Sequence, residues 1–368
     1  MTRVQDLDTP ALVIDLDIME RNLQRVADYA ASHKLRLRPH TKTHKSLLIA
    51  QKQLALGAAG LTVAKTTEAE VMLGAGAGEL LVAFPVIGEA KARRLASIAG
   101  ILGKSADGTP RVTIAIDSVF GAKQLSQAAE VAGVRLGILV EIDVGLGRAG
   151  VAPSEAVAFT SAVAALPHLD CLGFTFYPGH IKDQSEQKIA ELSETVARVR
   201  EELVRAGYPP KVVSGGSTPL LYRSHEVEGL NEIRPGTYVF NDLNTVAGGA
   251  CNLEDCAASV LVTVASHTHP ERMIVDGGSK TFSSDKLSSG GPGHGRLLEA
   301  PGAVFHKMNE EHGFIDLSAA ERDFTVGDKV RIIPNHICVA VNLHEYVYGV
   351  RDGVVEEVWN VEARGKLQ

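Results

Sequence analysis

The sequence predicts an α/β fold in which a TIM-type (β/α)8 barrel is followed by a smaller all-β domain. Two observations predict it. Strand-like and helix-like segments alternate over the first two-thirds of the chain, and short strands separated by Gly-rich turns dominate after residue 245. The alternation indicates parallel strands joined by crossover helices. A count of eight or nine strands favours a closed barrel, and a doubly wound open sheet is the alternative.

The expected barrel occupies residues 8–245. Apolar and β-branched runs predict its strands at Leu12–Ile14, Leu35–Leu37, Leu61–Ala64, Leu80–Ala83, Val112–Ile116, Gly137–Ile142, Leu172–Tyr177, Val212–Val213 and Thr237–Phe240. Apolar residues three to four positions apart predict helices at Leu16–His33, Thr67–Gly74, Ile87–Ala99, Ala122–Ala132, Pro153–Ala165 and Ser185–Ala206.

The expected β domain comprises residues 246–368 together with the extreme N-terminus. Its strands are predicted at Ala257–Ser266, Arg272–Asp276, Lys329–Ile333, Tyr346–Arg351 and Val354–Trp359. The connection from Ser279 to Leu298 is longer than a typical loop, which indicates a functional or partner-facing role.

Composition narrows the class of protein. The 368 residues are 45% hydrophobic and 22% charged, as in an ordinary globular protein, and the formal net charge of −7 gives no electrostatic reason to expect a nucleic-acid or membrane partner. No apolar run approaches the roughly 20 residues of a membrane span, and the first residues lack the apolar core of a signal peptide. We therefore expect a cytoplasmic protein. Among the four cysteines, Cys251 and Cys256 are interpreted as packing residues.

A basic segment, Arg38-Pro39-His40-Thr41-Lys42-Thr43-His44-Lys45, follows the short predicted strand Leu35–Leu37. Lys42 stands there among like charges. Such neighbours disfavour the protonated amine and free it to attack an aldehyde, as a lysine that binds pyridoxal phosphate must. The alternative is a basic solvated loop.

Two further motifs carry the chemistry of a site. Ser214-Gly215-Gly216-Ser217-Thr218 follows a late barrel strand, where glycines let backbone N–H groups approach an anion, although a plain Gly-Ser turn is the alternative. His336 and Cys338 are two positions apart on an expected strand from Lys329 to Val341, so both side chains would face one ion. Imidazole and thiolate favour zinc over manganese or magnesium, and a buried Cys beside a His is the alternative.

These motifs, in this order, resemble the D-threonine aldolase and D-serine dehydratase family, which are pyridoxal-phosphate enzymes of the alanine-racemase fold. The resemblance runs from about residue 8 onward and is carried by Asp8–Asp15, Arg38–Lys45, Asp143–Gly150, Ser214–Thr218, Pro334–Cys338 and Val361–Gly365.

The resemblance implies a role for particular residues. Lys42 would hold the cofactor as a Schiff base, and Gly216, Ser217 and Thr218 would bind its phosphate. Arg148 would lie beside the cofactor ring, with an Asp143 ion pair as the alternative. Tyr177 would lie near the cofactor, and Tyr238 would touch the phosphate or ring unless it is a core residue. His180 would act as general base unless it is a solvated loop histidine.

The resemblance also implies a divalent metal on His336 and Cys338, where it would hold the β-hydroxyl of the substrate. The candidates for supporting these ligands are Asn335, Asn342, Glu311 and His312. A homodimer is implied as well.

The predicted function is therefore a lyase that acts on a small-molecule D-β-hydroxy-α-amino acid. It would cleave D-threonine-like substrates by a retro-aldol reaction to glycine and an aldehyde. The close alternative is a dehydratase that converts D-serine or D-3-hydroxyaspartate to a 2-oxo acid and ammonia, which the His-x-Cys pair favours. The tail segments Val350–Glu356 and Ala363–Gly365 favour the aldolase. From a different class, a non-catalytic pyridoxal-phosphate-binding protein is a further alternative.

Overall fold

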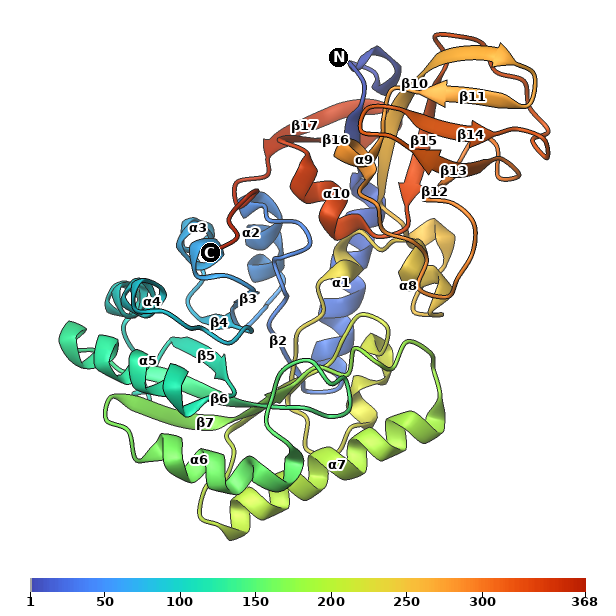
Figure 1. Ribbon diagram of the computed structural model, residues 1–368. Helices are drawn as coiled ribbons and strands as arrows, with labels where there is room; N and C mark the ends of the chain where they lie inside the picture. Colours follow the sequence, from blue (N-terminus) through green and yellow to red (C-terminus); the bar gives the residue numbers. More distant parts are fainter. Residues whose placement is uncertain (1) are drawn as a thin grey trace. The chain divides into compact units, whose positions relative to one another are not determined.

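The structure, a computed structural model, describes residues 2–368 (Figure 1). It consists of two compact units. The barrel unit comprises residues 26–42, 47–236 and 366–368, and the β unit comprises residues 2–25, 43–46 and 237–365. Among the described residues, none of the helices combines the length and the apolar character needed to cross a bilayer.

The barrel unit is built on eight parallel strands, in the order β2-β9-β8-β7-β6-β5-β4-β3. The strands are β2 (Arg36–Leu37), β3 (Leu61–Val63), β4 (Leu80–Val82), β5 (Val112–Ile116), β6 (Leu136–Ile142), β7 (Leu169–Phe176), β8 (Val212–Gly215) and β9 (Glu232–Ile233). A parallel bridge between His40 and Thr62 joins the chain after β2 to β3. This bridge closes the barrel, because β2 also pairs with β9.

Helices cover the outside of this barrel (Figure 1). They are α2 (Leu47–Ala55), α3 (Thr66–Met72), α4 (Glu89–Leu102), α5 (Val119–Ala132), α6 (Ala156–Ala164) and α7 (Glu186–Arg205), with short 3-10 helices η2 (Leu73–Ala75), η3 (Pro153–Glu155) and η4 (Leu221–Glu226). Helix α7 shows why they form, since its buried residues Ile189, Leu192, Val196, Val199 and Leu203 recur every three to four positions. Burying each such side chain contributes roughly 1.5–3 kcal/mol.

The β unit contains a nine-stranded sheet whose main path runs β13-β14-β11-β10-β1-β16-β17, with β15 on β10 and β12 on β15. The strands are β1 (Ala11–Asp15), β10 (Ala258–His269), β11 (Arg272–Val275), β12 (Gly295–Leu297), β13 (Val304–Met308), β14 (Gly313–Asp316), β15 (Lys329–Pro334), β16 (Tyr346–Arg351) and β17 (Val354–Asn360). Its helices are η1 (Val4–Asp6), η5 (Thr237–Val239), α8 (Leu243–Ala247), η6 (Leu253–Asp255), α9 (Ser279–Phe282) and α10 (Ile337–Leu343). Helix α1 (Leu16–Ser32) begins in the β unit and ends in the barrel unit.

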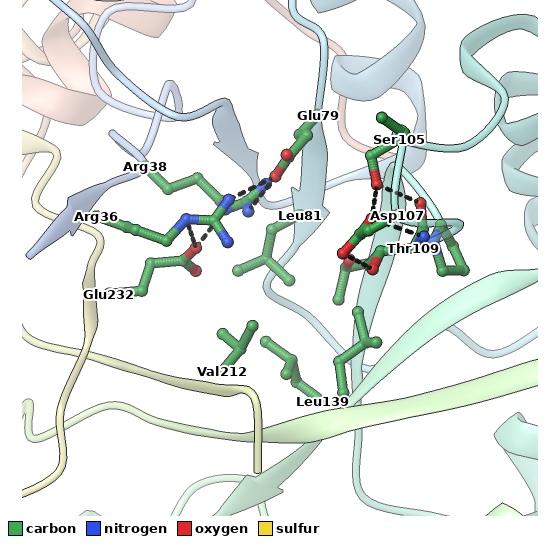
Figure 2. Close-up of a pocket in the computed structure, with 14 residues that line it drawn as sticks. Arg36, Arg38, Glu79, Leu81, Ser105, Asp107, Thr109, Leu139, Val212 and Glu232 are labelled. Atoms are coloured by element: carbon green, nitrogen blue, oxygen red, sulfur yellow. Dashed lines mark hydrogen bonds and ion pairs between the residues drawn. The ribbon is translucent and has the colours of Figure 1, made fainter.

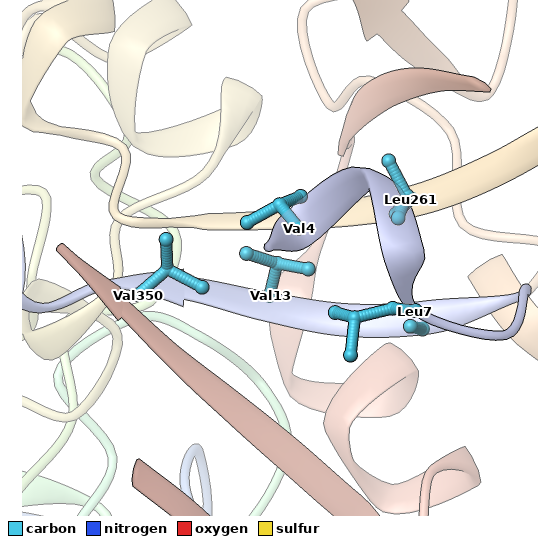
Figure 3. Packing of buried hydrophobic residues seen from close by; sticks show 6 residues of the cluster. Val4, Leu7, Val13, Leu261 and Val350 are labelled. Atoms are coloured by element: carbon cyan, nitrogen blue, oxygen red, sulfur yellow. The ribbon is translucent and has the colours of Figure 1, made fainter. Parts of the chain in front are cut away.

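The amino-terminal segment packs against the sheet of the β unit through an apolar cluster (Figure 3). Helix η1 supplies Val4, and Leu7 follows it. Both pack with Val13 of β1, Leu261 of β10 and Val350 of β16. Because β1 pairs with both β10 and β16, this cluster makes the start of the chain part of the same core as its end.

The two-part architecture predicted from the sequence is confirmed, with differences in detail. The run Leu12–Ile14 was expected in the barrel, but it is β1 of the β unit, because an apolar run buried on both faces fits either sheet. The segment Thr237–Phe240 forms η5 rather than a strand, and the barrel strand that it was expected to supply is β9. The β unit begins at Thr237 rather than after residue 245, and it is mostly β because it also carries short helices.

Candidate active site

The predicted cofactor residues of the barrel unit follow the carboxyl ends of its strands. Lys42 comes after the His40–Thr62 bridge that extends β2, Arg148 lies in the loop after β6, and Tyr177 directly follows β7. The Ser214–Thr218 segment ends β8. Parallel strands present all their carboxyl ends on one face of a barrel, and that face carries the active site in enzymes of this architecture.

Tyr177 brings two of the predicted residues together. The Lys42 ammonium lies 5.8 Å from the centre of the Tyr177 ring. The Arg148 guanidinium lies 5.1 Å from the same ring centre. Both cations therefore lie beside one aromatic ring, within the range of a cation–π contact.

The cluster of basic side chains that was expected around Lys42 is only partly formed. Arg38 points to carboxylates instead, with its Nε 2.9 Å from Glu232 and its Nη2 2.7 Å from Glu79. The prediction was wrong for Arg38 because a buried guanidinium needs a carboxylate partner, and Arg38 finds two of them in Glu232 and Glu79.

The loop after β6 holds its shape through Asp143. The carboxylate of Asp143 accepts the N–H groups of Gly145 at 2.9 Å and Gly147 at 3.1 Å. Burial acts to raise the pKa of Asp143, but these donors keep it below its usual range. Asp143 thus orders this loop through backbone groups, while Arg148 extends over Tyr177.

His180, the predicted general base, packs against this same loop. Gly145 has a φ of +117°, and a Cβ added there would lie 3.3 Å from His180 Nε2. The glycine therefore permits the loop and the imidazole to approach. His180 itself is exposed, so it is open to a substrate.

The predicted phosphate loop has the properties of an anion cradle. Gly216 adopts a φ of +88°, a conformation that favours glycine. Ser217 and Thr218 are buried, and Ser217 Oγ has no hydrogen-bond partner among residues 2–368. A buried hydroxyl without a partner is costly, so the residues present fit a phosphate group that would accept this bond.

Arg234 fixes two of these loops, and sequence reasoning did not identify it. This fully buried guanidinium donates to Ser214 Oγ at 2.7 Å and to the carbonyl of Phe176 at 3.1 Å. Ser214 begins the phosphate loop and Phe176 precedes Tyr177. Ser214 in turn donates to Glu232 at 2.7 Å. The sequence carried a signal in the segment Arg234-Pro235-Gly236-Thr237-Tyr238, but only Tyr238 was predicted from it as a site residue.

Glu141, a buried carboxyl on β6, interacts electrostatically with this arginine. Burial raises the pKa of the Glu141 carboxyl, against the opposing charges of Arg234 and Arg148. Burial likewise lowers the pKa of Arg234, while Glu141 and Glu232 oppose the shift. The charge states of Glu141 and Arg234 therefore depend on each other.

The two predicted metal ligands lie in the β unit, in a local structure that differs from the prediction. Strand β15 ends at Pro334, and His336 is the N-cap of α10 rather than a residue within a strand. The strand stops there because Asn335 turns inward and donates to the carbonyls of Asp285 and Gly293. His336 and Cys338 still come together, on the first turn of a helix.

Asp242 orients the His336 ring, and sequence reasoning missed it. Its carboxylate is fully buried and accepts His336 Nδ1 at 2.8 Å and the Ile337 N–H at 3.1 Å. The other carboxylate oxygen caps α8 by accepting the Thr245 N–H at 2.9 Å. A carboxylate on Nδ1 leaves Nε2 as the ligating nitrogen, which is the usual arrangement of a metal-bound histidine. The Asp-x-x-Thr capping pattern was the available signal.

The electrostatics of the pair also suit a cation. The negative charge of Cys338 and the hydrogen bonds that His336 donates to Asp242 and Cys338 raise the pKa of His336 to about 11, against the opposing effect of burial. A metal ion would take the place of this proton. A divalent cation therefore fits the donor set of one imidazole and one thiolate.

The residues around the pair differ from those expected. Cys338 Sγ lies 3.2 Å from Thr43 Oγ1 and 3.9 Å from Thr237 Oγ1. Asn342 accepts the Gly365 N–H, and Glu311 pairs with Lys280 at 2.8 Å. Within residues 2–368 no cluster of three or more His, Cys, Asp or Glu side chains is placed to hold a metal.

Tyr238 belongs to η5 of the β unit and is 3% exposed. Its expected contact with the cofactor stays a prediction.

A cavity of about 430 Å³ lies at the opposite end of the barrel unit (Figure 2). Arg36, Thr113, Val212 and Glu232, which line it, stand at the amino-terminal starts of their strands. Its arginines pair with Glu79 and Glu232. Because this end of a barrel ordinarily serves stability, we assign the cavity a structural role.

Comparison with known proteins agrees with this geometry. The model of the alanine racemase N-terminal domain family matches residues 14–243, and a serine dehydratase domain model matches residues 257–350. The 3-hydroxy-D-aspartate aldolase of Paracoccus denitrificans (strain Pd 1222) is 36% identical, over 98% of this chain and 93% of that protein.

Solved structures show the same relationship. The D-threonine aldolase of Filomicrobium marinum superposes with a TM-score of 0.91 at 33% identity, covering 99% of this chain and 98% of that one. A D-threo-3-hydroxyaspartate dehydratase, solved as a cysteine-to-alanine mutant in the metal-free form, gives a TM-score of 0.88 at 30% identity over 98% and 99% of the two chains.

The barrel of parallel strands and the mostly β unit, together with the family match over residues 14–243, define a pyridoxal-phosphate enzyme of the alanine-racemase fold. Within that class the chain belongs to the D-threonine aldolase and D-serine dehydratase family of lyases. Because these relatives are lyases, the alternative of a non-catalytic pyridoxal-phosphate-binding protein is not supported.

Proposed function

We propose that the protein is a pyridoxal-phosphate- and divalent-metal-dependent lyase that cleaves D-threonine-like D-β-hydroxy-α-amino acids to glycine and an aldehyde. The observation that carries the proposal is the imidazole–thiolate pair of His336 and Cys338, with the imidazole oriented by buried Asp242. Alanine racemization alone gives such a pair no task. A β-hydroxyl is the kind of oxygen ligand that a Lewis-acidic metal would bind and polarise.

Lys42 is the residue that would hold the cofactor. Its ammonium and the Arg148 guanidinium both lie within about 6 Å of the centre of the Tyr177 ring. Ser217, with its unpartnered hydroxyl, would hold the phosphate together with Gly216 and Thr218. When bound, pyridoxal phosphate supplies the electron sink that stabilises negative charge at the substrate Cα.

The remaining proton transfers are assigned to this chain's own side chains. His180 would accept the proton of the β-hydroxyl, since its exposed imidazole is open to a substrate and histidine is the side chain that most often acts as a general base. Arg148 would keep its positive charge beside the cofactor ring. Zinc is the proposed metal, because thiolate is a soft ligand that manganese and magnesium do not favour.

A dehydratase that acts on D-serine or 3-hydroxy-D-aspartate is the second candidate. The cysteine at position 338 favours it, because the dehydratase relative was solved in a metal-free form when a cysteine was replaced. In that reaction Lys42 would remove the proton from Cα. The 3-hydroxy-D-aspartate aldolase and D-threonine aldolase relatives favour the first candidate.

Product analysis separates the two candidates. The purified protein is incubated with D-threonine, 3-hydroxy-D-aspartate and D-serine, with and without a chelator. Glycine plus an aldehyde supports the aldolase, whereas a 2-oxo acid plus ammonia supports the dehydratase. Full activity after complete removal of metal would refute the metal role of His336 and Cys338.

The Lys42 assignment has its own test. The Lys42→Ala protein should lose the visible absorbance of covalently bound cofactor, whereas the Lys34→Ala control should keep it. Persistence of that absorbance in Lys42→Ala would contradict the assignment. The proposed homodimer is measured separately by light scattering after gel filtration.

A further inference from the structure

A pair of cysteines is brought together by a single closed turn of the β unit. Cys251 precedes and Cys256 follows the 3-10 helix η6 (Leu253–Asp255). The turn is closed by the Asn252 N–H, which donates to Asp255 Oδ2 at 3.0 Å. The two thiols are hydrogen-bonded to each other. The packing role expected for these residues from the sequence does not account for this arrangement.

The two thiols are not equivalent. Cys251 is partly exposed and Cys256 is buried. The hydrogen bond with Cys256 lowers the pKa of Cys251, while the same bond and burial raise the pKa of Cys256. An accessible thiol with more thiolate character beside a buried one is the arrangement of an attacking and a resolving cysteine.

A short chain of hydrogen bonds leads from this pair to the proposed metal ligand. Cys251 Sγ lies 3.5 Å from Thr245 Oγ1. The Thr245 N–H donates to one oxygen of Asp242 at 2.9 Å, and the other oxygen of Asp242 holds His336 Nδ1 at 2.8 Å. Whatever moves Thr245, in the first turn of α8, therefore acts on the carboxylate that orients the imidazole.

We propose that Cys251 and Cys256 form a reversible redox modification site that controls metal binding at His336. The oxidant is a small-molecule disulfide. The Cys251 thiolate attacks one sulfur of that disulfide, forms a mixed disulfide and expels one thiol. Cys256 then gives up its proton, attacks the Cys251 sulfur and expels the second thiol. The cysteine pair loses two electrons and two protons, and the small molecule gains them as two thiols.

Closing this disulfide removes the hydrogen bond between Cys251 and Thr245 and draws the end of α8 toward η6. The support of Asp242 for His336 weakens as a result. Loss of such support ordinarily lowers metal affinity by 10- to 100-fold, and we expect zinc affinity to fall on the order of 10-fold. This second part of the inference rests on the proposed metal site.

The test uses the zinc-loaded holoenzyme, with glutathione disulfide as the oxidant. Peptide mapping under non-reducing conditions should find a peptide that links Cys251 to Cys256, and dithiothreitol should remove it. Transfer of zinc to a chromophoric chelator is then compared between oxidised and reduced protein, and oxidation should increase the transfer. The Cys251→Ser variant keeps a hydroxyl near Thr245 but cannot form the disulfide, so the oxidant should not change its zinc transfer.

Three results would overturn the inference in separable ways. Absence of the linked peptide, while the oxidant modifies other thiols, overturns the redox site. A linked peptide with unchanged zinc transfer overturns the control of metal binding. An equal response of Cys251→Ser shows that another thiol, such as Cys338, causes the effect and overturns that control as well. A reduced protein that retains no zinc would refute the proposed metal site, whereas the linked peptide would still support the thiol pair.

Discussion

Replacement of Asp242 by asparagine should disturb the hydrogen bond that orients the His336 ring while leaving His336 itself unchanged. The Asp242 carboxylate accepts three N–H groups, from His336, Ile337 and Thr245, and is fully buried. Asparagine is a good helix cap, so its oxygen can keep the Thr245 bond. Its NH2 group would then face His336 and Ile337. It would donate to His336 Nδ1, which moves the ring proton to Nε2, the nitrogen needed by the metal.

The magnitude follows from these contacts. A change in a carboxylate that supports a ligating histidine costs about 10- to 100-fold in metal affinity, or roughly 1.4–2.8 kcal/mol at 1.4 kcal/mol per tenfold. The Ile337 N–H would face a second donor, and a buried group without a partner costs about 1–3 kcal/mol of folding stability. We therefore expect weaker zinc binding and a lower free energy of unfolding.

Zinc affinity is measured by competition with a chromophoric chelator, and stability by urea unfolding of the metal-free protein. Asp276→Asn is the matched control, because Asp276 also accepts a backbone N–H and a hydroxyl within the β unit, from Thr263 and Thr9. The control should lose stability but keep its zinc affinity. Asp242→Asn protein that binds zinc as tightly as the unaltered protein would refute the orienting role.

Three further predictions concern single side chains. Ser217→Ala should weaken cofactor binding about 10- to 100-fold, because it removes a hydrogen bond to a charged group worth roughly 1.5–3 kcal/mol. The change Thr160→Val removes another buried hydroxyl that has no hydrogen-bond partner in the described part of the chain, and it should not weaken cofactor binding in a spectroscopic titration. Cys338→Asp should shift the metal preference from zinc toward manganese, because a carboxylate is a harder ligand than a thiolate; unchanged preference in a metal-activation series would contradict this. Burial lowers the pKa of His344 to about 4, so the unfolded state binds more protons between pH 4 and about 6.5. Stability should therefore be complete above about pH 6.5 and fall by at most about 3 kcal/mol toward pH 4, and urea unfolding of His344→Gln should lack most of that acid-side loss.

The sequence was sufficient for the order of the elements and for the motifs at the strand ends. Helix α7 was predictable because its buried residues recur every three to four positions, and strands β5 and β6 were predictable because each is a nearly continuous apolar run. Lys42 and the Ser214–Thr218 loop were predictable because a strand end followed by these residue types occurs in a recognisable order. These properties are encoded over a few neighbouring positions, so no tertiary contact is needed to read them.

Only the tertiary structure decided which sheet an apolar run joins and which side chains meet. Strand β1 lies far from β10 and β16 in the chain. Because it pairs with both of them, it belongs to the sheet of the β unit and not to the barrel. Arg38 turned from Lys42 to Glu232 because a buried guanidinium needs a carboxylate, and that carboxylate lies almost two hundred positions away. Asp242 contacts His336 across 94 positions, because its buried carboxylate also needs hydrogen-bond donors. A local pattern can name the residues that do chemistry, but the partners that orient them come from long-range burial, which a single segment does not encode.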